Sequence, residues 1–476
     1  MGCRFSQRFT FRVKPQPFVR PPPLGIPETV PTFTRLHAMA PVAMPPGRTS
    51  RSDRANPTIA ALPPFEAAMR MQTFAPTSID QLQGYLEEDA VPHRRSLALI
   101  GGGTALRCGF PLKRECVRVE LAGLSRVVDY PARDMTITVE AGICVAELQR
   151  VLGTERQRLS LDLPQAADAT IGGAIATNAG GSRRLGHGTF RDYLIGMAAL
   201  DGQGRAFHAG GRVVKNVAGY DLCKLMIGSQ GSLGILTEVT LKVRPLPELL
   251  EVVLLAYDSS DAVEVALQHM VTTATRPVAV DLFNALGIER LQSLAGLPLP
   301  QGRYLLVVVL EGSEREVRWQ VQTLLDEMQP TRPIADEAIG PLESAVLMQA
   351  LTEFTAVAAD TPQAHLSVPP SSLSKVVSEL NLQGFWIQAH AANGQVRAIF
   401  PERWSTGESL PQNWDKVLEV ATLVRGQAVL VGGIERIRNH MPVMGHRRDD
   451  WSIMEGIKQQ LDPHDLLNPG RVRFHS

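Results

Sequence analysis

The sequence predicts an α+β protein in two parts, the first shaped by glycine-rich loops and the second built from alternating strands and helices. Glycine is very dense between Pro164 and Gly234, where few helical periods are visible, so the backbone there is expected to follow the outline of a ligand. After Arg244-Pro245-Leu246-Pro247, strand-like and helix-like segments alternate, which is typical of a sheet covered by helices. This division predicts domains at 69–245 and 246–476.

Length and composition indicate a globular protein of two or three domains. The chain has 476 residues, of which 44% are hydrophobic, and its 48 basic residues balance 48 acidic ones. The best apolar run, Tyr304–Leu310, has the length of a strand rather than of a membrane span. No basic excess points to nucleic acid. We therefore expect neither a transmembrane segment nor a nucleic-acid partner.

Residues 1–68 are expected to form a disordered extension rich in proline and arginine. Residues 1–65 contain 13 of the 34 prolines and nine basic residues against two acidic ones, without a hydrophobic period. Two origins remain open. Arg-rich, acid-poor N-termini are typical of organelle transit peptides. Alternatively, the segment reflects an over-long gene model, and translation starts at Met39, Met44, Met69 or Met71.

The first folded part is expected to consist of short elements. Thr77-Ser78-Ile79-Asp80 is typical of a helix N-cap and predicts a helix towards Leu86. A second helix is predicted over 145–152. The expected strands, each apolar or alternating, are 97–100, 117–121, 126–130, 135–141 and 235–243.

The second part is predicted to be a sheet with helices on one face. Its expected strands are 252–257, 278–283 and 304–310. Helices are predicted over 261–271 and 313–328. The second of these begins with Ser313 and Glu316, which form a capping box, and carries an apolar stripe.

A loop of three glycines and a threonine, Gly101-Gly102-Gly103-Thr104, follows the first long strand directly. Residues without a Cβ allow successive backbone N–H groups to converge on an anion, and the threonine hydroxyl adds a donor. The loop is neither a Walker loop nor the dinucleotide fingerprint G-x-G-x-x-G. By itself it is equally consistent with an ordinary tight turn.

A second set of motifs gives the loop its meaning. These motifs are Pro164, Asp168-Ala169-Thr170-Ile171-Gly172-Gly173, Ala176-Thr177-Asn178-Ala179-Gly180-Gly181, Lys215-Asn216-Val217-Ala218-Gly219-Tyr220-Asp221-Leu222 and Gly228-Ser229-Gln230-Gly231-Ser232-Leu233-Gly234-Ile235. Together they resemble the FAD-binding domain of the vanillyl-alcohol oxidase and p-cresol methylhydroxylase (PCMH) superfamily over about residues 70–245. The tail, with Asn468-Pro469-Gly470-Arg471, resembles the segment with which many members return to the flavin. Within the superfamily the chain is most similar to the GlcE-like second FAD-binding subunits of bacterial glycolate oxidase.

The resemblance implies a two-subdomain PCMH-type FAD-binding domain followed by an α+β cap domain. It also implies that backbone groups of the glycine-rich loops hold FAD. The implied cofactor-binding residues are Gly101, Gly102, Gly103, Thr104, Ala105, Pro164, Asp168, Ala169, Thr170, Ile171, Gly172, Gly173, Thr177, Asn178, Gly180, Ile235 and Asn468.

The FAD is expected to be non-covalent, and no metal site is expected. Covalent attachment in the superfamily commonly uses a His or Cys near these loops, but no His lies between His93 and His187, and Cys108 is off the usual place. Catalytic relatives carry a His-Ala-Gly-Asp-Gly-Asn-x-His stretch that can hold a divalent metal. The corresponding stretch here begins at His390 and lacks both the Asp and the second His, so His390 is interpreted as structural. The catalytic residues stay unassigned.

The expected function is that of an FAD-binding subunit of a glycolate oxidase or dehydrogenase complex. It would act on a small 2-hydroxy acid, beside a sister FAD subunit with the intact metal motif and an iron–sulfur subunit. The five scattered cysteines suit neither a cluster nor an oxidising compartment, which favours the cytoplasm, with or without attachment to the inner membrane through partners. Two alternatives remain: a self-sufficient FAD-dependent dehydrogenase of the D-lactate type, and a non-catalytic flavoprotein scaffold.

Overall fold

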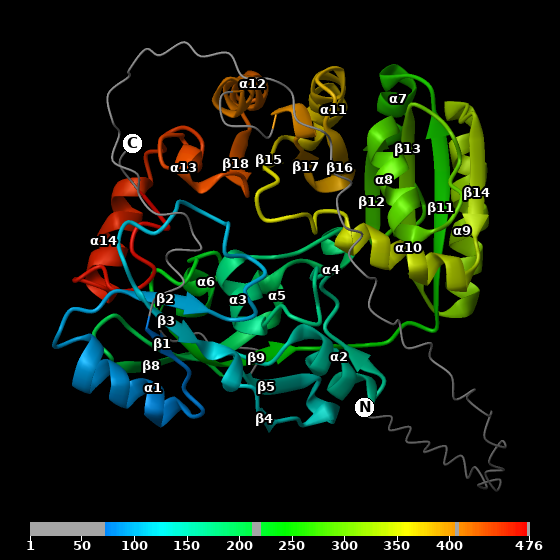
Figure 1. Cartoon of the computed structure of the whole chain (residues 1–476). Helices are drawn as coiled ribbons and strands as arrows, with labels where there is room; N and C mark the ends of the chain where they lie inside the picture. The colour runs from blue at the N-terminus through cyan, green and yellow to red at the C-terminus, as the bar shows by residue number, and fades with distance from the viewer. Residues whose placement is uncertain (1–71, 212–219, 405–408, 474–476) are drawn as a thin grey trace, which may run out of the picture. The chain divides into compact units, whose positions relative to one another are not determined.

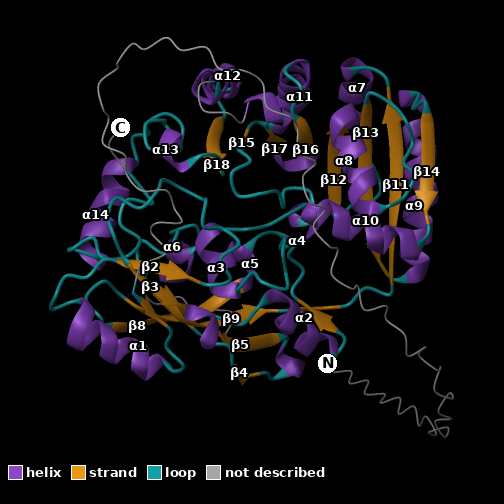
Figure 2. Ribbon diagram, in the orientation of Figure 1, coloured by secondary structure: helices purple, strands orange, loops and turns teal. Residues whose placement is uncertain are grey.

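The computed structural model describes residues 72–211, 220–404 and 409–473 (Figure 1). The expected N-terminal extension, 1–68, lies outside the described residues. From residue 72 the chain forms a sequence of mixed helices and strands, which Figure 2 shows as purple and orange segments.

A small parallel sheet opens the described chain. Its strands run in the order β1-β3-β2, with bounds β1 (Thr73–Phe74), β2 (Leu97–Ile100) and β3 (Val117–Glu120). Helix α1 (Ile79–Tyr85) begins after Ser78, whose hydroxyl accepts a hydrogen bond from the amide of Gln81, so the predicted N-cap is confirmed. The C-terminal tail returns to this sheet, where Leu467 forms a parallel bridge with Leu97.

A second, antiparallel sheet has the order β4-β5-β9-β7-β8. Its strands are β4 (Val127–Asp129), β5 (Thr136–Glu140), β7 (Leu194–Leu200), β8 (Ala206–Gly210) and β9 (Ile235–Lys242). Helices α2 (Val145–Gly153), α3 (Ile171–Thr177) and α5 (Phe190–Tyr193) contribute to its core, whereas β6 (Gln157–Arg158) pairs with β10 (Arg244–Pro245). The sequence did not predict β7 and β8, because their glycine and alanine content hides the strand period.

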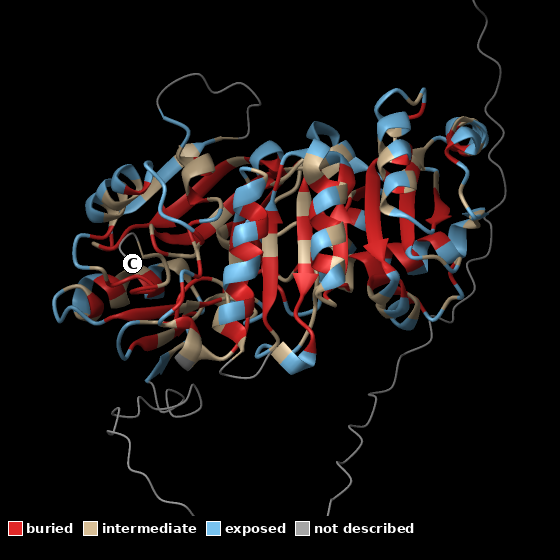
Figure 3. Ribbon diagram, turned by 90° about the horizontal axis from the view of Figure 1, so that it is seen from above, coloured by how far each residue is buried: buried red, intermediate tan, exposed pale blue. Residues whose placement is uncertain are grey.

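The remaining chain builds an eight-stranded antiparallel sheet in the order β14-β11-β13-β12-β16-β17-β15-β18. The strands are β11 (Leu249–Tyr257), β12 (Ala279–Asn284), β13 (Tyr304–Gly312), β14 (Ala335–Ile339), β15 (Gln363–Ser367), β16 (Trp386–His390), β17 (Gln395–Ile399) and β18 (Gln427–Val431). The central strands are deeply buried, as the red ribbons in Figure 3 show.

Helices cover the two halves of this sheet differently. Helices α7 (Ser260–Val271), α9 (Glu314–Met328), α11 (Leu373–Leu382) and α12 (Leu410–Leu423) share one apolar core along one face. On the opposite face, α8 (Ala285–Ala295) and α10 (Pro341–Glu353) pack on β11, β12 and β13. The expectation of helices on one face is therefore wrong for this half, because β11 and β13 are apolar on both faces and need two layers of cover.

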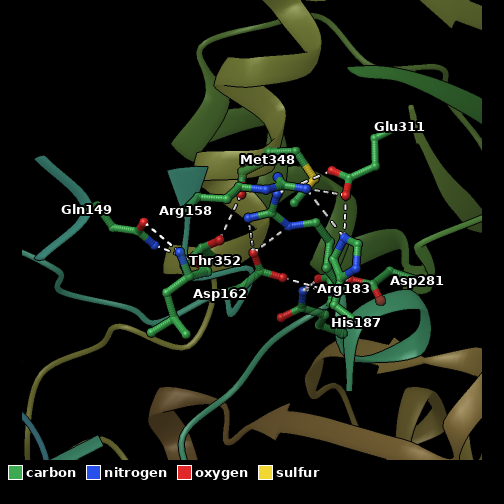
Figure 4. Close-up of polar contacts among 12 residues, drawn as sticks. Gln149, Arg158, Asp162, Arg183, His187, Asp281, Glu311, Met348 and Thr352 are labelled. Atoms are coloured by element: carbon green, nitrogen blue, oxygen red, sulfur yellow. Dashed lines mark hydrogen bonds and ion pairs between the residues drawn. The ribbon is translucent and has the colours of Figure 1, made fainter. Parts of the chain in front are cut away.

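A buried cluster of charged side chains joins the two parts of the fold (Figure 4). Glu311 at the end of β13 accepts from Arg158 and His187, and its second oxygen lies 3.5 Å from Nη1 of Arg183. Arg183 also pairs with Asp162 at 2.7 Å. Burial alone would raise the pKa of Glu311, but the bonds from His187 and Arg158 and the nearby guanidinium charges lower it to about 2. The carboxylate is therefore charged and fixes the second part against the first.

Candidate active site

A cavity of about 1030 Å³ lies between the glycine-rich loops and the eight-stranded sheet. Its wall combines the loop after β2, the region from 163 to 180, the loop before β9, strands β15, β17 and β18, and the C-terminal tail. Fifteen of the seventeen residues implied by the resemblance line it. They are Gly101, Gly102, Gly103, Thr104, Ala105, Pro164, Ala169, Thr170, Gly172, Gly173, Thr177, Asn178, Gly180, Ile235 and Asn468.

The two implied residues that do not reach the wall are Asp168 and Ile171. Ile171 is completely buried in the apolar core at the start of α3, as its place next to the Thr170 N-cap requires. Asp168 is exposed, and its backbone carbonyl supports the first glycine loop from behind. Both residues therefore shape the wall rather than form it.

The first glycine loop is held so close to its neighbour that only glycine fits. A Cβ on Gly102 would lie 1.6 Å from the carbonyl oxygen of Asp168, and one on Gly101 would lie 2.1 Å from the hydroxyl of Thr170. Gly103 has a φ of +76°, which side chains rarely adopt. Within the described chain, the amides of 101–104 donate to no protein acceptor. They are thus free to bind the oxygens of an anion.

The tail contributes Asn468, which joins two loops of the wall. Its Oδ1 accepts from the amide of Leu99 at 2.8 Å, and its Nδ2 donates to the carbonyl of Gln230 at 2.8 Å. The side chain is therefore already satisfied by protein groups. We infer that Asn468 positions β2 and the Gln230 loop beside the cavity.

The opposite wall is the polar face of three neighbouring strands, which sequence reasoning missed. Gln363, His365 and Ser367 of β15 line the cavity. So do Gln395 and Arg397 of β17 and Gln427, Val429 and Val431 of β18. The residues between them, such as Leu366 and Leu430, point into the apolar core. The signal was present as period-2 alternation in β15 and β17, but only the pairing of the strands gathers their polar positions into one surface.

Positive charge without a counterion marks this cavity. Neither the guanidinium of Arg397, on β17, nor that of Arg184, in α4 (Arg184–His187), has a hydrogen-bond or ion-pair partner among the described residues. Burial, and then the charge of Arg184, lower the pKa of Arg397 to about 10. Burial also lowers the pKa of Arg184. The two guanidiniums therefore face a space that favours an anion.

Several buried polar atoms of the wall also lack partners. They are Oγ of Ser229, Oε1 of Gln230, Nε2 of His365 and Oδ1 of Asn393. Unsatisfied polar atoms are rare in protein interiors and costly. These four atoms on the wall of one cavity, together with the free amides of the glycine loop, fit a large polar ligand such as FAD.

His390 lies outside this wall. It is buried on β16, and its Nδ1 is 2.7 Å from Oδ1 of Asp281, whose other oxygen accepts from Ser182 and Gln388. Arg397 stands where the second histidine of the metal stretch would fall. No group of three metal-ligating side chains occurs in the described part of the chain. The interpretation of His390 as structural agrees with its place in this network.

The cysteines of the described chain are all free thiols. Cys108 lines the cavity, where burial raises the pKa of its thiol. Burial raises the pKa of Cys116 and of Cys223 to about 11. High pKa values keep these thiols protonated and poorly nucleophilic. Non-covalent attachment of FAD stays a prediction.

Comparison with known proteins agrees with this geometry. Residues 72–210 match the FAD binding domain family, and residues 438–472 match the C-terminal domain of FAD linked oxidases. The glycolate oxidase subunit GlcD of Bacillus subtilis (strain 168) is 24% identical over 87% of this chain and 90% of its own length. The D-lactate dehydrogenase of Anaerostipes hadrus is 26% identical over 80% of this chain and 84% of its own length. The glycolate oxidase subunit GlcE of Escherichia coli (strain K12) is 34% identical, over 35% of this chain and 48% of its own length.

Among solved structures, p-cresol methylhydroxylase with bound substrate superposes with a TM-score of 0.64 at 15% identity, covering 84% of this chain and 88% of that one. Alkyldihydroxyacetonephosphate synthase gives a TM-score of 0.58 at 16% identity, covering 83% and 75%. These likenesses establish the fold. With its two matching families, its glycine-lined cavity and its PCMH-type FAD-binding fold, this chain is an FAD-dependent oxidoreductase whose cofactor is FAD.

Proposed function

We propose that this chain oxidises a small 2-hydroxy acid to the corresponding 2-oxo acid. The observation that carries the proposal is the pair of unpartnered arginines in the FAD cavity, because a 2-hydroxy acid brings the carboxylate that such a site needs. The proteins to which the chain is similar are named as glycolate oxidase subunits and as dehydrogenases of D-lactate and D-2-hydroxyglutarate, all of them 2-hydroxy acids.

The residues lining the glycine side are proposed to hold the cofactor. The free amides of 101–104 would bind the diphosphate, while the small residues between 169 and 180 would allow the rest of FAD to lie against the backbone. FAD, when bound, supplies the acceptor for the hydrogen and the two electrons of the substrate's carbinol carbon. The chain's own task is then to exclude water and to orient the acid. In this proposal, residues 69–245 form the FAD-binding domain, and residues 246–476 form the cap domain with the tail that returns to the flavin.

At the finer level, we propose that the chain is a subunit of a glycolate oxidase complex, with a sister FAD subunit and an iron–sulfur subunit. The match to GlcE and the altered stretch after His390 support this role. The described helices include none that is long and apolar enough to cross a membrane. Such a subunit would work in the cytoplasm, with attachment to the inner membrane through its partners.

A self-sufficient dehydrogenase is the second candidate, and a specific observation favours it. The match to GlcE covers 35% of this chain, whereas the matches to a D-2-hydroxyglutarate dehydrogenase and a D-lactate dehydrogenase cover 83% and 80% of it. The two candidates differ in where the electrons go after the flavin is reduced.

The test is anaerobic mixing of the purified holoprotein with glycolate, D-lactate and D-2-hydroxyglutarate while the visible flavin band is followed. Bleaching by at least one acid is expected, and no bleaching by any of them would contradict the proposed oxidation. Steady-state turnover is then measured with dyes, alone and after addition of purified sister and iron–sulfur subunits. Turnover that needs the subunits supports the complex, whereas full turnover alone supports the self-sufficient enzyme.

A further inference from the structure

His365 and Arg397 lie directly opposite each other on neighbouring strands. They are paired residues in the antiparallel ladder of β15 and β17, and both line the cavity. Opposite residues of such a ladder point to the same face with their Cβ atoms about 5 Å apart. The imidazole and the guanidinium therefore occupy one patch of the wall.

Arg184 reaches the same cavity from the other part of the fold, and its helix is firmly anchored. In α4, the amide of Gly186 donates to the carbonyl of Val278 at 3.0 Å, and His187 binds Glu311 in the buried cluster of Figure 4. A Cβ on Gly186 would lie 2.8 Å from Val278, so the contact needs glycine. The fold thus fixes the backbone that carries Arg184.

The two other cavity arginines hold the protein itself. Nη1 of Arg471 donates to the carbonyls of Leu106 and, at 3.2 Å, of Cys108. Nη1 of Arg107 donates to the carbonyl of Gly433 at 3.3 Å. The guanidiniums of Arg184 and Arg397 make no such bonds among the described residues, and the charge of Arg184 disfavours the charged form of Arg397. An anion bound between the two guanidiniums would offset this repulsion and accept hydrogen bonds from both of them.

We propose that Arg184 and Arg397 together bind the carboxylate of the 2-hydroxy acid, and that His365 accepts a hydrogen bond from its hydroxyl group. The inference rests on the proposed function and names the part of the cavity that would recognise the two groups defining this substrate class.

The state of His365 suits an acceptor. Neither ring nitrogen has a hydrogen-bond partner in the described chain, and Nε2 is enclosed. Burial, followed by the charges of Arg397 on β17 and His390 on β16, lowers the pKa of His365 well below 6.5. The facing position on β18 is Val429, which carries no charge. The imidazole is therefore neutral at physiological pH and offers one lone pair.

The experiment uses two ligands that FAD cannot oxidise and that differ in the hydroxyl. 2-Hydroxyisobutyrate has no hydrogen on its carbinol carbon, and isobutyrate lacks the hydroxyl group. Dissociation constants are measured on the holoprotein from the shift of the flavin absorption. The wild type is expected to prefer the hydroxy acid by about three- to tenfold, as one neutral hydrogen bond supplies.

The variants separate the two roles. Arg397→Met and Arg184→Met should each raise the dissociation constants of both ligands by about ten- to a hundredfold. The dissociation constants of Arg397→Lys should lie between those of the wild type and of Arg397→Met. His365→Phe should bind isobutyrate like the wild type and lose the preference for the hydroxy acid. Arg133→Met, which removes an exposed charge away from the cavity wall, is the control and should change neither constant.

Stability gives a second readout. An unpartnered guanidinium in a desolvated site costs stability, so Arg397→Met should keep its flavin and should melt no lower than the wild type without ligand.

Unchanged ligand affinity in both arginine variants, or an unchanged hydroxyl preference in His365→Phe, would overturn the inference even if 2-hydroxy acids reduce the flavin. A wild type that neither binds these ligands nor is reduced by any 2-hydroxy acid would instead refute the proposed function.

Discussion

Single residues of this protein show most clearly where a side chain is forbidden. The Cβ position of Gly102 is occupied by the carbonyl of Asp168, so this glycine is required before any cofactor is considered. From the sequence, glycine was expected here because residues without a Cβ allow successive backbone amides to converge on an anion. The structure adds that a side chain at this position would overlap with the protein's own backbone. Even the methyl group of alanine is therefore expected to disturb the loop.

Gly102→Ala should therefore already lower the flavin content, and Gly102→Leu should abolish it. A methyl group at 1.6 Å from a carbonyl oxygen forces the loop or residues 168–170 to move, and the free amides of 101–104 then no longer converge. The measurement is the ratio of flavin absorbance to protein after gel filtration. Gly84→Ala is the matched control, since nothing lies within 4 Å of its Cβ position. Wild-type flavin content in Gly102→Leu would mean that this loop does not hold the cofactor.

At the scale of elements, features that depend on neighbouring residues in the sequence differ from features that depend on how distant strands pair. The helix start at Ser78 and the strand at 97–100 depend on neighbours in sequence, and both were predicted. The polar face of β15, β17 and β18 could not be predicted in the same way. Its residues lie up to about 70 positions apart, and only the ladder order places His365 beside Arg397. The glycine-rich wall of the cavity could therefore be predicted from the sequence, whereas the wall formed by β15, β17 and β18 could not.

The contact between β13 and α4 is expected to make stability depend on pH. The pKa of Glu311 is lowered from its ordinary value of 4.5 to about 2, so its contribution is fully present above pH 4.5 and is lost as the pH falls towards 2. Such a shift corresponds to roughly 3 kcal/mol at neutral pH. Glu311→Gln should therefore melt several degrees lower than the wild type at pH 7, and the difference should shrink below pH 4.5.

Glu314→Gln provides the comparison for this prediction, because it removes an exposed carboxylate whose partner, Arg318, is also exposed. Exposed pairs contribute little, so its melting temperature should stay close to that of the wild type at every pH. A pH-independent difference between wild type and Glu311→Gln would show that the glutamate acts through shape rather than charge.

For the whole molecule, the first question is how the cofactor is held. FAD is expected to be released into the supernatant when the protein is precipitated with acid, because the thiol of Cys108 has a raised pKa and is a weak nucleophile, and His187 is occupied by Glu311. The supernatant is examined for flavin absorbance, and the washed pellet for residual colour. A yellow pellet after denaturation would demonstrate a covalent bond.

If FAD leaves in this way, the apoprotein can be refilled, and the cofactor should then stabilise both parts of the fold together. The cavity wall is shared between the glycine loops and the strands β15, β17 and β18, while the tail bridges back to β2 through Asn468. A ligand that binds only the folded state and is present at a hundred times its dissociation constant adds about 2.7 kcal/mol to the free energy of unfolding.

Tryptophan fluorescence can follow the second part of the fold. All five tryptophans, at 319, 386, 404, 414 and 451, lie beyond residue 246, so their fluorescence reports the unfolding of that part alone. With FAD bound, the unfolding transition seen by tryptophan fluorescence should move to a higher temperature. It should then coincide with the temperature at which flavin is released. A tryptophan transition that ignores FAD would show that the second part unfolds independently of the cofactor, and that the wall formed by its three strands contributes nothing to holding it.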